Sequence, residues 1–390
     1  DWSSDVCSSD LVFASTRESA EASMRVALAE LLKSGVTTVA DLSVPFEGWL
    51  DVLGESGLRA VAAPMFRDAR WYTTNGHRLD YDWDPAAGRR AMDEAARLLD
   101  RARQHPSGRL SGMVVPAQID TCTPELLQES HRLAVERDLP FQIHVSQSVT
   151  EFHEMYRRHG RTPVQWMDDL GVLDARAVLG HAIFLDHHPW LHWTSRDDLA
   201  RVRERGASVA HCPTVFVRRG IALRTFGSYV RDSVNVGIGT DTYPHDFLAE
   251  LRVASYTART IAETVTDHSA AELFTAATVG GARALRRDDI GRIAVGAKAD
   301  LVLVDLEHPA MRPVYDPVRE LIYSADSRVV RDVWVDGEQV VADGEVRTLD
   351  LAAATAALEE AQVKVLERVP ELDWAGRDIT ALAPRCFDFG

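Results

Sequence analysis

The sequence has little lysine, little cysteine and no long apolar run. Lysine occurs only at Lys33, Lys298 and Lys364, so arginine supplies nearly all of the 43 basic residues. The four cysteines are far apart and form no CxxC pair, which argues against a disulfide framework or a zinc knuckle and predicts a reducing, cytoplasmic compartment. No apolar run approaches the roughly 18–20 residues of a membrane-spanning helix, so no membrane partner is expected.

The charge balance is strongly acidic. Asp and Glu number 59 against the 43 basic residues, which gives a net charge of −16 at pH 7. Such a surplus disfavours a nucleic-acid backbone or an anionic lipid surface as a partner. The 390 residues are 46% apolar, which is a globular composition with room for one barrel-sized domain and a smaller one.

The first eleven residues, DWSSDVCSSDL, contain a near-repeat without helical or strand period. They resemble translated adaptor sequence more than native protein. We therefore predict that residues 1–11 are a non-native leader and that natural sequence before Val12 is missing. A natural flexible arm is the alternative.

From Val12 to Asp289, strand-like runs alternate with helical patterns, which is typical of βα units around a parallel sheet. Ser15 and Glu18 predict a capping box for the first helix. Helices are predicted over 16–34, 85–104, 124–137 and 162–170, and strands over 36–42, 58–66, 112–116, 141–145, 177–180, 207–210 and 235–239. Seven strands predict a (β/α)8 TIM-type barrel over 12–289 with one strand unaccounted for; a doubly wound open sheet is the alternative.

The pattern changes after residue 289. Residues 290–346 contain two β-rich stretches with turn signals such as VDGEQ and ADGEV, which predict a small β domain. The remaining residues, 347–390, begin with an Ala/Glu/Leu-rich segment at 351–368 and predict a C-terminal helix and tail.

Four polar residues follow the last four predicted strands: His144, His181, His211 and Asp241. They are separated by 37, 30 and 30 residues, and each interval fits one strand–helix unit. In a parallel barrel the carboxyl ends of successive strands meet at one mouth. Imidazole and carboxylate groups at that mouth suit a divalent metal. For each histidine taken alone, a hydrogen-bonded structural role is the alternative.

Several of these segments resemble the amidohydrolase superfamily, in its cytosine deaminase, chlorohydrolase and nucleoside-derivative deaminase branch. They are SGVTTVAD, IHVSQS, GHAIFLD, AHCPT, VGIGTD and FTAATVGGARALRRDDIGRIAVGAKADLVLVD. The resemblance runs from about Thr16 to Glu345. It implies a metal-dependent hydrolase barrel that is joined to a β-sandwich built from both termini.

The resemblance also implies roles for the four polar residues. His144 would be a metal ligand, Asp241 a metal ligand and proton acceptor, and His181 a hydrogen-bond partner of the attacking water or the substrate. His211 begins the HCP segment that lines the substrate pocket. The implied cofactor is one divalent metal, Zn²⁺ or alternatively Fe²⁺, because the carboxylated lysine that bridges two metals in dinuclear relatives has no counterpart between Lys33 and the end of the predicted barrel.

Two family motifs are missing from this sequence. The HxH pair that follows the first strand and supplies two ligands does not occur, and Val36–Leu42 corresponds to the second strand. We therefore expect a barrel that lacks its first strand and binds metal weakly. Gln147 stands where deaminases carry a Glu, and an amide cannot transfer a proton as a carboxylic acid can.

The expected reaction is hydrolysis of a non-peptide C–N bond, with an amino group on a heterocycle as the leading substrate. A chlorohydrolase-like displacement is one alternative, and a truncated fragment or pseudoenzyme without activity is the other. Besides His211, substrate contacts are expected from Gln147, Tyr243 and His245, and from Trp71 in the aromatic loop 67–84. A homo-oligomer is expected by analogy alone.

Overall fold

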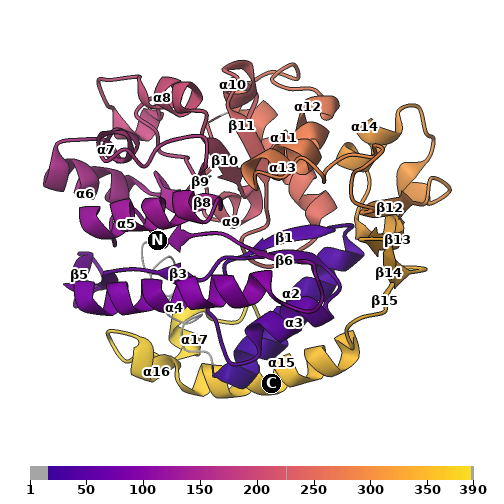
Figure 1. Ribbon diagram of the computed structural model, residues 1–390, viewed down its shortest axis with the longest axis horizontal. Helices are drawn as coiled ribbons and strands as arrows, with labels where there is room; N and C mark the ends of the chain where they lie inside the picture. The colour runs from indigo at the N-terminus through magenta and orange to yellow at the C-terminus, as the bar shows by residue number, and fades with distance from the viewer. Residues whose placement is uncertain (1–15, 225, 388–390) are drawn as a thin grey trace.

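The computed structural model describes residues 16–224 and 226–387, and parallel strands curve around its centre (Figure 1). These strands, in chain order, are β1 (Thr38–Asp41), β2 (Arg59–Ala62), β3 (Met65–Phe66), β6 (Leu110–Gly112), β7 (Val115–Pro116), β8 (Phe141–Val145), β9 (Ala177–His181), β10 (Ser208–His211) and β11 (Asn235–Ile238). All ladders among them are parallel, which follows from the helical connections between successive strands.

The strands follow one another around an open barrel. One sheet has the order β1-β2-β6, β3 pairs with β7, and a second sheet has the order β8-β9-β10-β11. Single bridges from Val114 to Phe141 and from Gln118 to His144 connect the β6–β7 position with β8. Among the described residues no ladder joins β11 to β1. The TIM-type architecture predicted from the sequence is confirmed.

Helices occupy most of the connections between these strands. They are α2 (Arg17–Lys33), α3 (Trp49–Glu55), α4 (Pro85–Arg103), α5 (Pro124–Glu136), α6 (Val149–His159), α7 (Pro163–Asp169), α8 (Asp198–Arg205), α9 (Pro213–Val217), α10 (Phe226–Arg231), α11 (Phe247–Ala262), α12 (Ala270–Thr275) and α13 (Gly281–Ala284), with short turns η1 (Pro189–Leu191) and η2 (Ala276–Gly280). The predicted capping residue of α2, Ser15, lies outside the described residues. Thr16 is the N-cap instead, because its hydroxyl accepts the backbone N–H of Ser19 at 3.2 Å.

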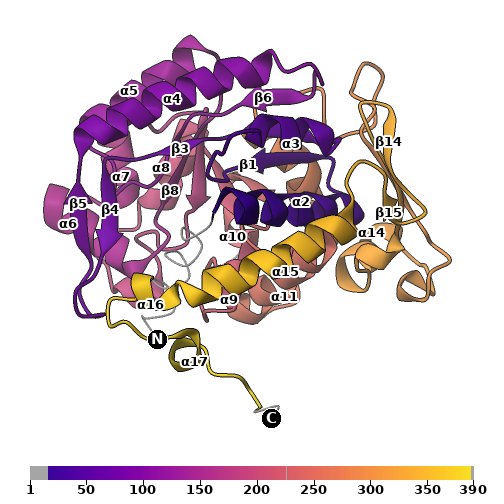
Figure 2. The same cartoon turned by 90° about the horizontal axis from the view of Figure 1, so that it is seen from below.

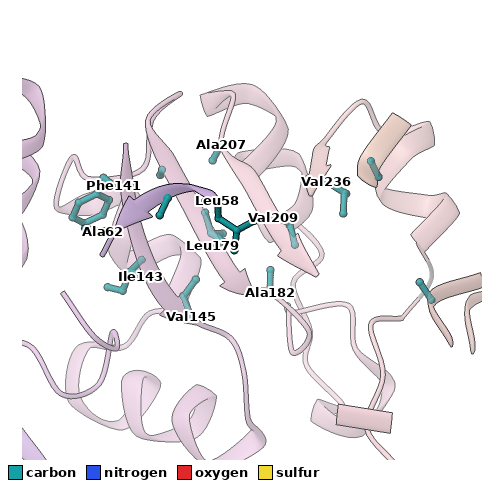
Figure 3. Close-up of a cluster of buried hydrophobic side chains, with 14 of the residues drawn as sticks. Leu58, Ala62, Phe141, Ile143, Val145, Leu179, Ala182, Ala207, Val209 and Val236 are labelled. Atoms are coloured by element: carbon teal, nitrogen blue, oxygen red, sulfur yellow. The ribbon is translucent and has the colours of Figure 1, made fainter. Parts of the chain in front are cut away.

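On the outer face of the barrel strands, a row of cross-strand neighbours forms part of the hydrophobic core. Ile143, Leu179, Val209 and Val236 stand opposite one another on β8, β9, β10 and β11 (Figure 3). All are buried, which contributes roughly 1.5–3 kcal/mol for each side chain. Because successive side chains of a strand point to opposite faces, the residues between them point into the barrel.

The aromatic segment 67–84 is a hairpin and not the loop expected from the sequence. Strand β4 (Ala69–Tyr72) pairs antiparallel with β5 (Asp80–Trp83), and Trp71 stands opposite Tyr81. Aromatic residues favour β-strands because their side chains pack against those of the neighbouring strand. The turn residues at 73–76 obscured this strand signal in the sequence.

The C-terminal part adds a second, antiparallel sheet and a long helix. Strands β12 (Leu301–Val304), β13 (Val330–Val335), β14 (Glu338–Ala342) and β15 (Glu345–Val346) form the sheet. The intervening and following elements are η3 (Pro309–Met311), α14 (Pro317–Tyr323), η4 (Ser327–Val329), α15 (Leu351–Glu367), α16 (Val369–Leu372) and α17 (Ile379–Leu382). Figure 2 shows α15 lying along α2, so the last long helix covers the first one. Of the helices described, none combines the length and the apolar character needed to cross a membrane.

Candidate active site

Three of the predicted polar residues meet at one end of the barrel. The imidazole rings of His144 and His181, at the ends of β8 and β9, have centroids 5.4 Å apart. The Nε2 atom of His181 lies 3.9 Å from an oxygen of Asp241, which follows β11. Residues that are nearly a hundred positions apart in the chain therefore share one site.

The tautomer of His144 is set by the neighbouring strand position. Its Nδ1 lies 2.6 Å from the carbonyl oxygen of Ala117, which has no proton to give, so Nδ1–H donates. In the neutral ring Nε2 is then the unprotonated nitrogen, which leaves a lone pair available to a metal ion or to a substrate N–H.

His181 is neutral at physiological pH. Burial lowers the pKa of this imidazole to about 4, although the nearby Asp241 carboxylate acts in the opposite direction. Its Nδ1 is buried and has no hydrogen-bond partner in the described part of the chain, and its ring packs against Phe216 with centroids 4.5 Å apart. A neutral imidazole at this position can hydrogen-bond to water or substrate, but it carries no charge for them.

The backbone turns sharply just where these side chains are presented. Ser146, Ala182 and Asp241 have φ values of 55°, 52° and 60°, in the left-handed region that side-chain-bearing residues rarely adopt. Such conformations cost about 1–3 kcal/mol each and persist where the surroundings enforce them. The buried carboxylate of Glu151 does so for the first turn, since it accepts the backbone N–H groups of Ser146 at 2.5 Å and Gln147 at 3.0 Å.

A cavity of about 3,120 Å³ opens at this end of the barrel and extends between β1 and β11 toward α2 and α15. His144, His181 and Asp241 border it, as do four of the expected substrate contacts: Trp71, Gln147, Tyr243 and His245. Tyr243 is 70% exposed, whereas His245 is held by a 2.8 Å hydrogen bond between its Nδ1 and the Thr240 hydroxyl. The volume exceeds the roughly 300–1,000 Å³ of a typical small-molecule site, so a substrate fills only part of it.

His211, which was expected to line the substrate pocket, does not border this cavity. Ala210 and Cys212 face the cavity, so the alternation along β10 turns His211 to the opposite side. There it borders a separate void of about 10 Å³ beside Phe226 and α11. Burial lowers its pKa to about 3, which fits a neutral histidine packed behind the barrel wall.

Sequence reasoning missed three acidic residues at this end of the barrel, Asp41, Asp120 and Glu151. All three border the cavity. Asp41 ends β1 and accepts hydrogen bonds from the Ser43 hydroxyl at 2.5 Å and the Trp49 indole at 2.7 Å. Its place at a strand end is the same signal that identified His144. Asp120 had no local signal, because its partners Trp71 and Tyr81 come from the β4–β5 hairpin.

The side chains at the site are of the types that bind a divalent cation, but there are too few of them for a complete ligand set. His144 offers an imidazole nitrogen and Asp241 a carboxylate, which are usual zinc ligands. Catalytic zinc sites generally have three protein ligands, and within residues 16–224 and 226–387 no three His, Cys, Asp or Glu side chains gather closely enough to hold a metal ion. The described residues thus provide an incomplete set.

Comparison with known proteins agrees with this geometry. The model of the Amidohydrolase family matches residues 2–340. A 5-methylthioadenosine/S-adenosylhomocysteine deaminase from Natronomonas pharaonis is 31% identical over 90% of this chain and 78% of its own length. A 5'-deoxyadenosine deaminase from Methanothermobacter thermautotrophicus is 30% identical over 82% of this chain and 71% of its own.

Solved structures show the same fold. A zinc-bound adenosine deaminase from Xanthomonas campestris superposes with a TM-score of 0.77 and 27% identity, over 89% of this chain and 75% of its own. An atrazine chlorohydrolase variant from Arthrobacter aurescens, in complex with zinc and atraton, has the same TM-score at 23% identity, over 89% and 77% of the two chains. These findings support a hydrolase that acts on non-peptide C–N bonds, and the chain belongs to the amidohydrolase family.

Proposed function

We propose that this protein hydrolyses the amino group of an aminated heterocycle, with 5'-substituted adenosines as the substrate class, and releases ammonia. The observation that carries the proposal is the meeting of His144, His181 and Asp241 at the border of one cavity. The substrate class comes from the names of the deaminase relatives. The family match gives the reaction type.

The proposed roles follow from the state of each side chain. Asp241, 31% exposed to the cavity, accepts the proton of the attacking water. Neutral His181 orients that water, because its ring can accept or donate one hydrogen bond without competing for the proton. The amide of Gln147 and the phenol of Tyr243 hold the substrate at the border of the cavity.

His144 and Asp241 are also the residues that we propose as ligands of a divalent metal. A bound zinc ion would supply hydroxide at neutral pH by lowering the pKa of water from about 15.7 to about 7. The similar adenosine deaminase contains zinc, which makes Zn²⁺ the first metal to test. Fe²⁺ is the second.

The functional test is ammonia release from a panel of substrates with zinc in excess. The panel contains 5'-methylthioadenosine, S-adenosylhomocysteine, 5'-deoxyadenosine and a chlorinated triazine. We expect ammonia from at least one adenosine derivative. Zinc-saturated protein that releases neither ammonia nor chloride from any of them would refute the proposal and favour a non-catalytic chain.

Metal titration gives a separate prediction. Because the described residues provide only two ligands, we expect one zinc ion to bind with a Kd weaker than about 1 µM. His144→Ala should abolish the binding, whereas His153→Ala, at an exposed position on α6, should not change it. Isothermal titration of the metal-free chain measures both. Sub-micromolar affinity in the starting protein would show that the ligand set is complete.

A chlorohydrolase-like displacement is the second candidate, and Gln147 favours it. A leaving amine needs a proton, whereas chloride departs without one. The amide of Gln147 cannot donate a proton as an acid does, although it borders the cavity beside His144.

Gln147→Glu separates the two candidates. A carboxylic acid at this position should raise kcat/KM for amine release by about 10-fold or more, since general acid catalysis contributes typically about 10²–10⁴-fold, and should leave chloride release nearly unchanged. Steady-state rates for both substrates measure the ratio, with the exposed Gln104→Glu as the charge-matched control. If the ratio of kcat/KM for amine release to kcat/KM for chloride release does not change, Gln147 does not act on the leaving group.

The proposed cellular compartment follows from the state of the cysteine thiols. Among the described residues, Cys122 and Cys212 are buried free thiols and Cys386 is an exposed one. Free thiols persist in a reducing environment, so we propose that the protein is cytoplasmic.

A further inference from the structure

The buried Asp120 connects both strands of the aromatic hairpin to the barrel. One of its oxygens, Oδ2, accepts the indole N–H of Trp71 at 3.0 Å and the hydroxyl of Tyr81 at 2.7 Å. Trp71 on β4 and Tyr81 on β5 are direct cross-strand partners. A single carboxylate oxygen therefore holds the hairpin at one rung, and the side chain of Asp120 is completely buried.

Arg158 of α6 supports the same rung from the other side. Its guanidinium lies 4.1 Å from the centre of the Tyr81 ring and 5.0 Å from that of Trp83. It also donates a 2.6 Å hydrogen bond to the backbone carbonyl of Asp120 and pairs with Glu154. The hairpin is thus fixed between a carboxylate beneath it and a cation on its aromatic face.

This anchor adjoins the reacting groups. The residue before Asp120, Ile119, donates its backbone N–H to the carbonyl oxygen of His144 at 3.0 Å. Trp71, Tyr72 and other residues of the hairpin border the same cavity as His144. A shift of Asp120 would consequently move a wall of the cavity relative to the imidazole.

The other oxygen of Asp120, Oδ1, is buried and has no hydrogen-bond partner among the residues that the structure describes. An arrangement optimised for stability alone would satisfy both oxygens, because a buried unpaired acceptor is destabilising. The paired oxygen accepts hydrogen bonds from Trp71, which borders the cavity, and from Tyr81, the cross-strand partner of Trp71.

We propose that Asp120 is a positioning residue that fixes the β4–β5 hairpin as the wall against which the flat ring of the substrate lies, and so determines substrate affinity. The inference rests on the proposed function for its substrate class. Trp71 supplies the aromatic surface, Tyr81 the second tether, and Asp120 the common acceptor. None of the three takes part in proton transfer.

The kinetic test uses the full chain with zinc in excess and the best substrate of the panel. Asp120→Ala removes the common acceptor, so we expect KM to rise about 10- to 100-fold with kcat changed less than about 3-fold, the pattern of lost uniform binding. Tyr81→Phe keeps the ring over Arg158 but removes one tether and should give a smaller rise in KM. The double variant Asp120→Ala/Tyr81→Phe should be no worse than Asp120→Ala alone, because the acceptor of the Tyr81 hydroxyl is then already gone. Asp82→Ala, at an exposed position of β5, is the control.

A second measurement needs no substrate and separates this inference from the proposed function. Amide hydrogen exchange within residues 69–83 should speed up at least about 10-fold in Asp120→Ala and in Tyr81→Phe, while exchange in β8 and β9 stays unchanged. Unchanged exchange in the hairpin, or a fall in kcat with constant KM, would overturn the proposal. If no panel compound reacts but the hairpin loosens selectively, the proposed function fails and the anchoring role of Asp120 stands.

Discussion

Asp241→Asn should lower kcat/KM for deamination by about 10²–10⁴-fold, the usual contribution of a positioned general base. The substitution keeps the size of the side chain and removes its ability to accept a proton. Asp241 lies 3.9 Å from His181 and borders the cavity, so both the water and the substrate are within reach of its carboxylate in the proposed arrangement. The rate of ammonia release measures the loss.

Two further measurements make this result specific. Assays at saturating zinc distinguish a lost proton acceptor from a lost metal ligand, because only the latter is compensated by excess metal. Asp288→Asn removes an exposed carboxylate away from the cavity and should leave kcat/KM within about 2-fold of the starting value. A loss below about 10-fold in Asp241→Asn would exclude this residue as the proton acceptor.

Asp300→Ala should destabilise the fold by about 3–5 kcal/mol, because it leaves a buried arginine without its counter-ion. Arg59 on β2 and Asp300, just before β12, are 2% and 4% exposed and form a bidentate pair with N–O distances of 2.9 and 2.8 Å. A third contact, at 3.2 Å, joins Arg59 to Asp336, whose side chain is 35% exposed, and this single contact does not replace the bidentate pair. The midpoint of urea unfolding and its slope measure the change.

The matched comparison is an exposed ion pair. Glu94→Ala breaks the pair between Glu94 and Arg97 on α4, where both side chains are more than half exposed, and should cost less than about 1 kcal/mol. Arg59→Met combined with Asp300→Leu should recover much of the stability lost in Asp300→Ala, since no charge is then buried alone. If Asp300→Ala costs no more than Glu94→Ala, the pair does not tie the C-terminal sheet to the barrel.

The sequence predicted the barrel and the meeting of three polar strand-end residues because both depend on local order. Runs of apolar residues gave strands such as Phe141–Val145, which the structure reproduces residue for residue. The spacing of one βα unit then placed His144, His181 and Asp241 at the same end, because parallel strands all finish at one edge.

Other features depend on residues that are far apart in the chain. The hairpin β4–β5 looked like a loop because its turn residues are conspicuous and its pairing partner lies about ten positions away. Asp120 receives two side chains from positions 71 and 81. Nothing local to this carboxylate indicates these contacts.

The sequence by itself therefore determined the family, the parallel barrel and the groups that can do chemistry, since periodicity and motif spacing are local properties. Only the tertiary structure decided which side of β10 carries His211, how Asp120 secures the hairpin and how few metal ligands gather in the described residues. Those outcomes depend on burial and on hydrogen bonds across the fold, which form only when distant segments of the chain come together.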